Sequence, residues 1–312
     1  MPFKLNLYLP LFLPLLLLGC PGQIPDGAGC ADAIQELGFD NPAAISPKDL
    51  GCWPLATDGR PTSTMADPYG PRILGSRYDF HRGIDLQQPL GTPVYAITAG
   101  QVVLALSTQP GDDNDKLGKY VVIAHEDENG EPFQTKYQHL DSYSVQEGDE
   151  LAQGEQLGTV GNSGDGIDTV HLHFGLSMGR NDGVFSRVTS RNPLHILPYE
   201  QGEKQMVISR TDDTLSFALG QEPTSIDIVR WVITPEGHPP KVLGWESREG
   251  MDKDDDDTNP FENIEVIPES FRVATELYQV RVDYSGDWAG LNSCSLTLYD
   301  VRGRTYEFDQ QF

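Results

Sequence analysis

The pattern of apolar and polar residues along the chain predicts a protein built mainly of antiparallel β-strands. Between residues 61 and 200, short runs rich in Val, Ile, Tyr and Thr are broken by Gly and Asp, as in strands joined by turns. Strands are predicted at Tyr95–Leu106, Lys119–Ala124 and Val170–Leu176. Residues 61–200 are therefore expected to form one antiparallel β-sheet domain.

A second set of alternating runs occupies residues 203–312. Tyr278–Tyr284 alternates between apolar and polar positions, and Ser225–Ile233 is predicted to be a further strand. Ser293–Asp300 and Thr305–Phe308 are separated by Arg-Gly-Arg, which predicts a hairpin. Short alternating strands with turn signals are typical of a β-sandwich, so we expect a C-terminal β-sandwich-like domain whose role the sequence does not define.

The first 19 residues are predicted to be an export signal. Residues 5–18 are almost all apolar and follow Lys4. This stretch is shorter than the about 20 apolar residues that span a bilayer, which favours a secretory signal. It ends in Leu-Leu-Gly-Cys, which resembles a bacterial lipoprotein processing site and predicts a lipid on Cys20; an ordinary cleaved signal with an incidental cysteine is the alternative. Residues 20–60, rich in Pro and Gly, are expected to form a tether and an N-terminal segment.

Charge and cysteine content narrow the classes of function. The 312 residues include 22 Lys and Arg against 47 Asp and Glu, a formal net charge of −25. Because nucleic-acid binding needs a basic surface, this charge excludes nucleic acid as a partner and argues against tight binding to anionic polymers. Cys30 and Cys52 are predicted to form a disulfide bond, which would persist in an exported protein. Cys294 lies in an alternating run and is expected to be a buried, small apolar residue.

Two short motifs carry side chains suited to a metal ion. His81 and Asp85 lie in His-Arg-Gly-Ile-Asp, His171 and His173 lie in His-Leu-His, and His139 falls between the motifs. Residues two apart on a strand point to the same face, and a glycine between His81 and Asp85 lets the backbone bend. Zinc favours histidine nitrogen and carboxylate oxygen, and a catalytic zinc keeps one position for water. Scattered polar residues on strands are the alternative, but both patterns would then have to coincide by chance. We expect one catalytic Zn²⁺.

The residues around these motifs resemble the lysostaphin-type (LytM-like) zinc endopeptidases of bacterial cell walls. The resemblance covers roughly residues 65–180, under half of the chain. Its motifs recur in order, at Asp67–Arg72, Phe80–Leu86, Pro89–Ala96, Gly100–Val103, Gly118–His125, Tyr137–Leu140, Val145–Gly161 and His171–Gly175.

The resemblance implies a role for each of the five motif residues. His81, Asp85 and His173 match the zinc ligands, while His139 and His171 match two catalytic histidines. The implied activity is hydrolysis of peptide cross-links in peptidoglycan by a zinc-activated water. With the lipid anchor, the implied location is the cell envelope, at the periplasmic face of the outer membrane. The alternative is a non-hydrolytic regulator that binds and activates another wall hydrolase; such relatives usually lack the zinc ligands, and all five residues are present here.

Three features stand apart from these motifs. Asp252, Asp254 and Asp256 are spaced two apart and could surround a hard cation such as Ca²⁺, which takes about six to eight oxygen ligands; a solvated acidic loop is the alternative. The loop Ser107–Leu117 is acidic and departs from the aromatic or glycine-rich character expected of the family, so substrate contacts there are not predicted. His195, in an exit segment after the peptidase-like region, is expected to be structural.

Overall fold

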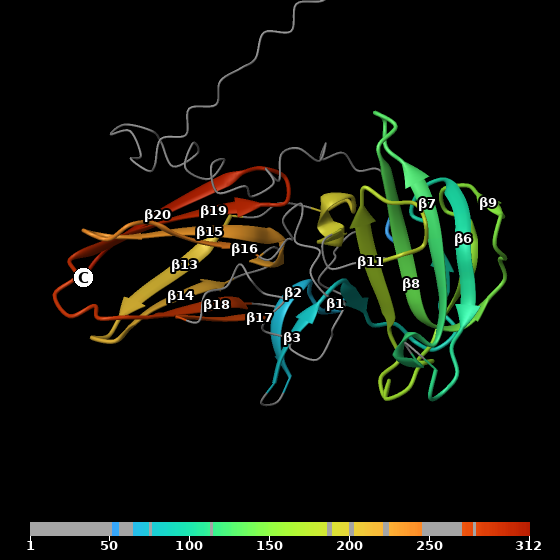
Figure 1. Ribbon diagram of the computed structural model, residues 1–312, viewed down its shortest axis with the longest axis horizontal. Coiled ribbons are helices and arrows are strands. Elements are labelled where there is room, and N and C mark those ends of the chain that lie inside the picture. The colour runs from blue at the N-terminus through green and yellow to red at the C-terminus, as the bar shows by residue number, and fades with distance from the viewer. Residues whose placement is uncertain are drawn as a thin grey trace, which may run out of the picture.

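The fold consists of two β-rich parts with a two-stranded hairpin between them (Figure 1). The computed structural model describes residues 52–55, 65–74, 77–112, 115–185, 189–199, 203–220, 225–244, 270–276 and 279–312. The described residues are mainly strand, and their sheets are antiparallel, which confirms the predicted fold class. None of them belongs to a helix that is long and apolar enough to cross a membrane. The predictions for Cys20, Cys30 and the run containing Asp252, Asp254 and Asp256 fall outside the described residues.

The larger sheet has ten strands and carries the peptidase-like motifs. Its main path runs β1-β4-β11-β8-β7-β6-β9, and β5, β10 and β12 pair with strands of this path or with each other. The predicted strands at Lys119–Ala124 and Val170–Leu176 correspond to β7 and β11. The bounds are β1 Met65–Asp67, β4 Ile84–Leu86, β5 Pro93–Tyr95, β6 Gly100–Ser107, β7 Lys119–Glu126, β8 Pro132–Tyr143, β9 Glu150–Leu151, β10 Gln156–Val160, β11 Leu172–Met178 and β12 Ser190–Arg191.

The single strand predicted over Tyr95–Leu106 is wrong, because the chain breaks between β5 and β6. In the break, the backbone forms hydrogen bonds with segments far away in sequence. The Ala96 amide donates to the Glu155 carbonyl at 2.9 Å, and the Ile97 amide donates to the Tyr137 hydroxyl at 3.1 Å. Both residues are fully buried, so these bonds satisfy polar groups that a continuous ladder would have paired.

The C-terminal part contains two four-stranded sheets, in the orders β13-β14-β18-β17 and β16-β15-β19-β20. Figure 1 shows them as two layers, the arrangement of a β-sandwich. In β14 the apolar residues Leu215, Phe217 and Leu219 are buried and alternate with less buried residues, as the period of a strand requires. The bounds are β13 Gln205–Arg210, β14 Thr214–Gly220, β15 Ile228–Pro235, β16 Lys241–Gly244, β17 Phe271–Glu276, β18 Gln279–Ser285, β19 Ser293–Asp300 and β20 Thr305–Gln311.

The predicted strand over Ser225–Ile233 begins later than expected. Residues Ser225–Asp227 form a 3-10 turn, η5, in which the Asp227 carboxylate is bound by two residues that precede the C-terminal sheets. Lys204 Nζ lies 2.5 Å from Asp227 Oδ1 with both side chains buried, and the Tyr199 hydroxyl donates to Asp227 Oδ2 at 3.1 Å. Burial raises the pKa of Asp227 to about 6, although the Lys204 charge opposes that rise.

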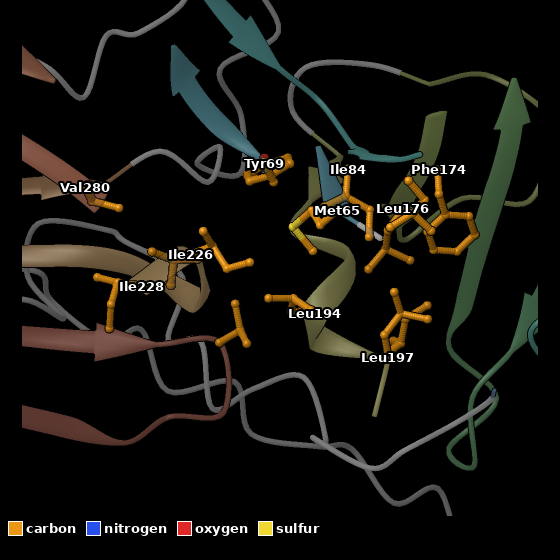
Figure 2. Packing of buried hydrophobic residues seen from close by; sticks show 14 of the residues in the cluster. Met65, Tyr69, Ile84, Phe174, Leu176, Leu194, Leu197, Ile226, Ile228 and Val280 are labelled. Carbon is orange, nitrogen blue, oxygen red and sulfur yellow. The ribbon is translucent and has the colours of Figure 1, made fainter. Parts of the chain in front are cut away.

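A continuous apolar cluster joins the two parts. Residues Pro193–His195 form the turn η4, and Figure 2 shows Leu194 between Met65, on β1, and Ile226, on η5. The Asn192 side-chain amide donates to the Ile226 carbonyl at 2.9 Å, which adds a polar contact at the same place. His195 is fully buried on η4, consistent with the predicted structural role. A division into domains at residues 200–203 stays a prediction.

The hairpin between the two parts also contacts the sandwich. It consists of β2, Gly70–Leu74, and β3, Arg77–His81, which pair with each other and with no other strand in the described residues. Strand β2 lies against β17 of the C-terminal part (Figure 1). The hairpin therefore has the peptidase-like sheet on one side and the sandwich on the other.

Two cysteines, Cys52 and Cys294, lie within the described residues, and no disulfide joins them. Cys294 is buried on β19, as predicted. Cys52 is half-buried, with its sulfur 3.6 Å from the Ile97 carbonyl oxygen. Its predicted partner, Cys30, lies outside the described residues, so the bridge stays a prediction.

Histidine 125 on β7 predicts a pH-dependent loss of stability. Its Nδ1–H donates to the Ala99 carbonyl at 2.8 Å, its Nε2 faces the Thr135 hydroxyl at 2.8 Å, and its ring stacks on Phe133. Burial lowers the pKa of His125 to about 4, from an ordinary value of 6.5. His125 is therefore protonated below about pH 6.5 in the unfolded chain, but only below about pH 4 in the folded chain. Folding stability must fall with pH through this window, by at most roughly 3 kcal/mol in total.

The measurement is urea unfolding of the wild type and the His125→Gln variant at pH 7.5 and 5.0. Because glutamine does not titrate, the variant should lose less stability than the wild type over this range. The other buried histidines are present in both proteins, so their contributions to the pH dependence of the unfolding free energy cancel when the two proteins are compared. Parallel pH profiles for the two proteins would contradict the prediction.

Candidate metal centre

Three side chains from different strands converge at one point of the larger sheet. His81 ends β3, Asp85 lies in β4 and His173 lies in β11. His173 stands directly opposite Asp85 in the ladder between β4 and β11, so strand register alone brings these two together. Within the described part of the chain, the three form a group whose donor atoms lie within 4.8 Å of one another and could hold a metal ion.

The distances and the donor types fit one zinc ion. His81 Nε2 lies 3.1 Å from Asp85 Oδ1 and 3.0 Å from His173 Nδ1, and His173 Nδ1 lies 2.8 Å from Asp85 Oδ1. Zinc bonds of about 2.0–2.1 Å at tetrahedral angles place ligand atoms roughly 3.3 Å apart. His81 Nδ1–H donates to the Pro68 carbonyl at 2.8 Å, which leaves Nε2 as the lone-pair nitrogen. Two imidazole nitrogens and a carboxylate oxygen thus face one another as electron-pair donors.

Gly83 lies so close to β11 that a larger side chain would not fit there. A Cβ on Gly83 would lie 2.6 Å from His173 Nε2 and 2.6 Å from the Phe174 carbonyl oxygen, closer than side-chain carbons approach other atoms. Its φ angle is not among the positive values of the chain. The expected reason for a glycine, backbone freedom to bend, is therefore wrong; the residue allows β11 to approach the turn between β3 and β4.

Two further histidines lie beside these three side chains. The rings of His139 and His171 have centroids 4.8 Å apart, and His171 Nε2 lies 3.7 Å from Asp85 Oδ1. His139 Nδ1–H donates to the Ser163 carbonyl at 3.0 Å, and His171 Nδ1–H donates to the Thr169 carbonyl at 3.0 Å. Since a carbonyl can only accept, the neutral form of each ring carries its proton on Nδ1. Each therefore has a bare Nε2 that can accept another proton.

A local irregularity in β8 places His139 at this site. Tyr137 and Leu140 are both fully buried in the core, with two residues between them where regular alternation allows one. The register of β8 with β7 shifts at this point, and its register with β10 shifts just beyond, between Leu140 and Ser142. His139 has φ 63, the one positive value for a non-glycine residue among those described. Such a conformation costs free energy and is most often found at functional sites. The extra residue lets Gln138 stand opposite His173 while His139 also reaches the site.

Burial and neighbouring charges favour the neutral forms of His139 and His173 and the ionised form of Asp85. Burial lowers the pKa of His139 to about 3, with His173 and His171 adding to the effect, and burial lowers the pKa of His173 to about 4. Burial alone would raise the pKa of Asp85, but His81 and His173 bring it well below its usual range. Neutral imidazoles and an ionised carboxylate are the forms that bind a metal ion.

The sequence did not indicate Arg72 as a residue of this site. Arg72 Nη1 lies 3.8 Å from Asp85 Oδ2, the carboxylate oxygen that does not face the two histidines, and 3.3 Å from Asp67 Oδ2. A cation on this side orients the carboxylate so that Oδ1 remains directed at His81 and His173. The predicted motif Asp67–Arg72 contains the residue, but its contact with Asp85 depends on how the hairpin folds.

This arrangement of two histidines and a carboxylate, with two more histidines beside them, is typical of a metal-dependent hydrolase. Residues 79–184 match the model of Peptidase family M23. M23 is a family of bacterial cell-wall peptidases that depend on zinc.

Relatives with this domain differ from the chain in overall length. Peptidoglycan DD-endopeptidase ShyA of Vibrio cholerae is 33% identical over 114 residues, which cover 36% of this chain and 24% of the relative. The uncharacterized lipoprotein YgeR of Escherichia coli is 31% identical over 153 residues, 49% of either chain. The catalytic domain of lysostaphin from Staphylococcus simulans is 31% identical, with a TM-score of 0.34, over 42% of this chain and 88% of that one. The chain thus spans a quarter to a half of the length of the two curated relatives.

Proposed function

We propose that the chain is a zinc endopeptidase that hydrolyses peptide cross-links of peptidoglycan, with His81, Asp85 and His173 as the zinc ligands. The observation that carries the proposal is the convergence of His81 Nε2, Asp85 Oδ1 and His173 Nδ1 within 3.1 Å of one another. Three protein ligands leave a fourth position, which a catalytic zinc needs and a structural zinc usually lacks. The M23 match and the peptidoglycan endopeptidase among the relatives support the substrate.

The chain's own residues supply proton transfer beside the metal. Zinc, when bound, would polarise the scissile carbonyl and lower the pKa of a water toward about 7. Of His139 and His171, one accepts the proton of the attacking water at Nε2, because its Nδ1–H is already donated to a backbone carbonyl. Once protonated, the same Nε2 can give that proton to the departing amine. The other histidine can stabilise the developing negative charge from Nε2 only as an imidazolium, because its Nδ1–H already donates to a backbone carbonyl and Nε2 must gain a second proton before it donates.

The experiment is digestion of purified peptidoglycan sacculi with the purified chain, followed by mass spectrometry of the released muropeptides. We expect cross-linked dimers to be converted to monomers with a new free amine. A chelator should stop the release, and added Zn²⁺ should restore it. If a zinc-loaded chain released nothing but stimulated another wall hydrolase, the chain would be the non-hydrolytic regulator instead.

A further inference from the structure

One lysine lies on the same face of the sheet as the metal centre. Lys136, on β8, stands opposite Gly175 on β11, and the next pair on that face is Gln138 opposite His173. A Cβ on Gly175 would lie 3.9 Å from Lys136 Cβ, so the lysine side chain leaves the sheet on this face. Two residues along a strand span about 7 Å, so the backbone of Lys136 lies roughly two residues of an extended substrate away from that of the metal ligand His173.

The ammonium group of Lys136 has no acidic partner among the described residues. The ammonium lies over the ring of Phe185, with Nζ 4.4 Å from the centroid. Burial lowers the pKa of Lys136 to about 8, and the nearby positive charge of Arg82 adds to the effect. At pH 7 the group is still mostly protonated. A half-buried cation without a carboxylate is notable in a chain whose acidic residues outnumber its basic ones, 47 to 22.

The segment that covers Lys136 is anchored to the same face. The buried Gln134 side chain, two residues before Lys136 on β8, accepts a hydrogen bond from the Gly183 amide at 2.9 Å and donates one to the Val184 carbonyl. These bonds hold Phe185 over the sheet beside Gly175, where a Cβ would lie in ordinary van der Waals contact, 3.5 Å, with a Phe185 ring carbon. The ring shields one side of the ammonium from water, which strengthens any charge interaction that a ligand makes with it.

We propose that Lys136 binds a carboxylate that the substrate carries next to the scissile bond, and so selects cross-links whose acceptor residue is acidic. The proposal rests on the proposed function. A diaminopimelate cross-link has such a group, because the carbon that bears the cross-linked nitrogen also bears a free carboxylate. A bridge made only of glycine has no carboxylate there. Lys136 is a substrate-binding residue in this scheme, and His139 and His171 carry out the proton transfers.

The test compares two cross-linked muropeptide dimers that differ in one group. One carries diaminopimelate with a free carboxylate at the cross-link, and in the other this carboxylate is amidated. We expect wild-type kcat/KM to be about 10- to 100-fold higher for the acid, the effect of one hydrogen bond to a charged group. In the Lys136→Met variant the acid should be cleaved no faster than the amide, whereas Lys136→Arg should keep most of the preference. The matched control is Lys241→Met on β16, an exposed lysine of the sandwich, which should show the wild-type ratio.

The outcomes separate this proposal from the proposed function. Equal cleavage of the two dimers by the wild type would overturn the role of Lys136 while leaving the endopeptidase intact. If Lys136→Met lost kcat/KM equally for both dimers, with normal zinc content and melting temperature, the lysine would be structural. This result would also overturn the proposed role of Lys136. If Lys136→Met failed to fold, the proposal would be tested by the wild-type ratio of kcat/KM for the two dimers and by whether Lys136→Arg keeps most of that ratio. A wild type that cleaved neither dimer nor a pentaglycine bridge would overturn both.

Discussion

The Asp85→Ala variant is expected to bind no zinc and to release no muropeptides from sacculi. Asp85 Oδ1 lies within 3.1 Å of both ligand nitrogens and is the single anionic donor of the three. Without it, two neutral imidazoles remain, and two ligands do not hold a zinc ion in competition with water. The loss of the carboxylate also leaves the Arg72 charge without this acidic neighbour, which moves the local charge further against a cation.

Zinc content by elemental analysis and turnover on sacculi are the two measurements for Asp85→Ala. The matched control is Asp141→Ala, which removes an exposed carboxylate from β8 and should keep both zinc and activity. Stoichiometric zinc in Asp85→Ala would show that the ligand assignment is wrong.

The variants His139→Ala and His171→Ala should keep zinc and lose turnover by roughly 10²–10⁴-fold each, the range for loss of acid–base assistance. Their Nδ1 atoms are held by the carbonyl groups of Ser163 and Thr169, and neither ring belongs to the group of three donors. His173→Ala should behave differently, because removal of a ligand releases the metal. Zinc content measured beside turnover for the three variants separates these roles.

A reversed pattern would exchange the roles of the two histidines in the His-Leu-His motif. If His171→Ala lost its zinc while His173→Ala kept it, His171 would be the ligand. If all three variants digested sacculi like the wild type, this chain would not use these residues for catalysis.

The features that could be predicted from the sequence are those that depend on neighbouring residues. The alternation around His171 and His173 predicts a strand with Leu172 and Phe174 on its other face, and both of these are fully buried. The hairpin of Ser293–Asp300 with the strand from Thr305 is found as predicted, because strand period and turn residues are both local signals.

The features that could not be predicted depend on contacts between distant residues. The break after Tyr95 follows from hydrogen bonds to Glu155 and Tyr137, which no local pattern contains. The irregularity that places His139 at the site is likewise invisible in Tyr-Gln-His-Leu, because it arises from two partner strands. Arg72 and Lys136 acquire their neighbours only when the hairpin and β11 take their places.

The contact between the hairpin and the sandwich limits where the chain could be cut or joined to another domain. His81 ends a strand whose partner, β2, lies against β17. A truncation near residue 200 would strip one flank from the hairpin that presents this side chain, and would also uncover Leu194 on η4. A domain that replaced the C-terminal part would therefore have to offer a surface that receives β2, if the hairpin is to keep its support on that side. The position of one metal-binding histidine thus links the choice of C-terminal domain to the metal centre.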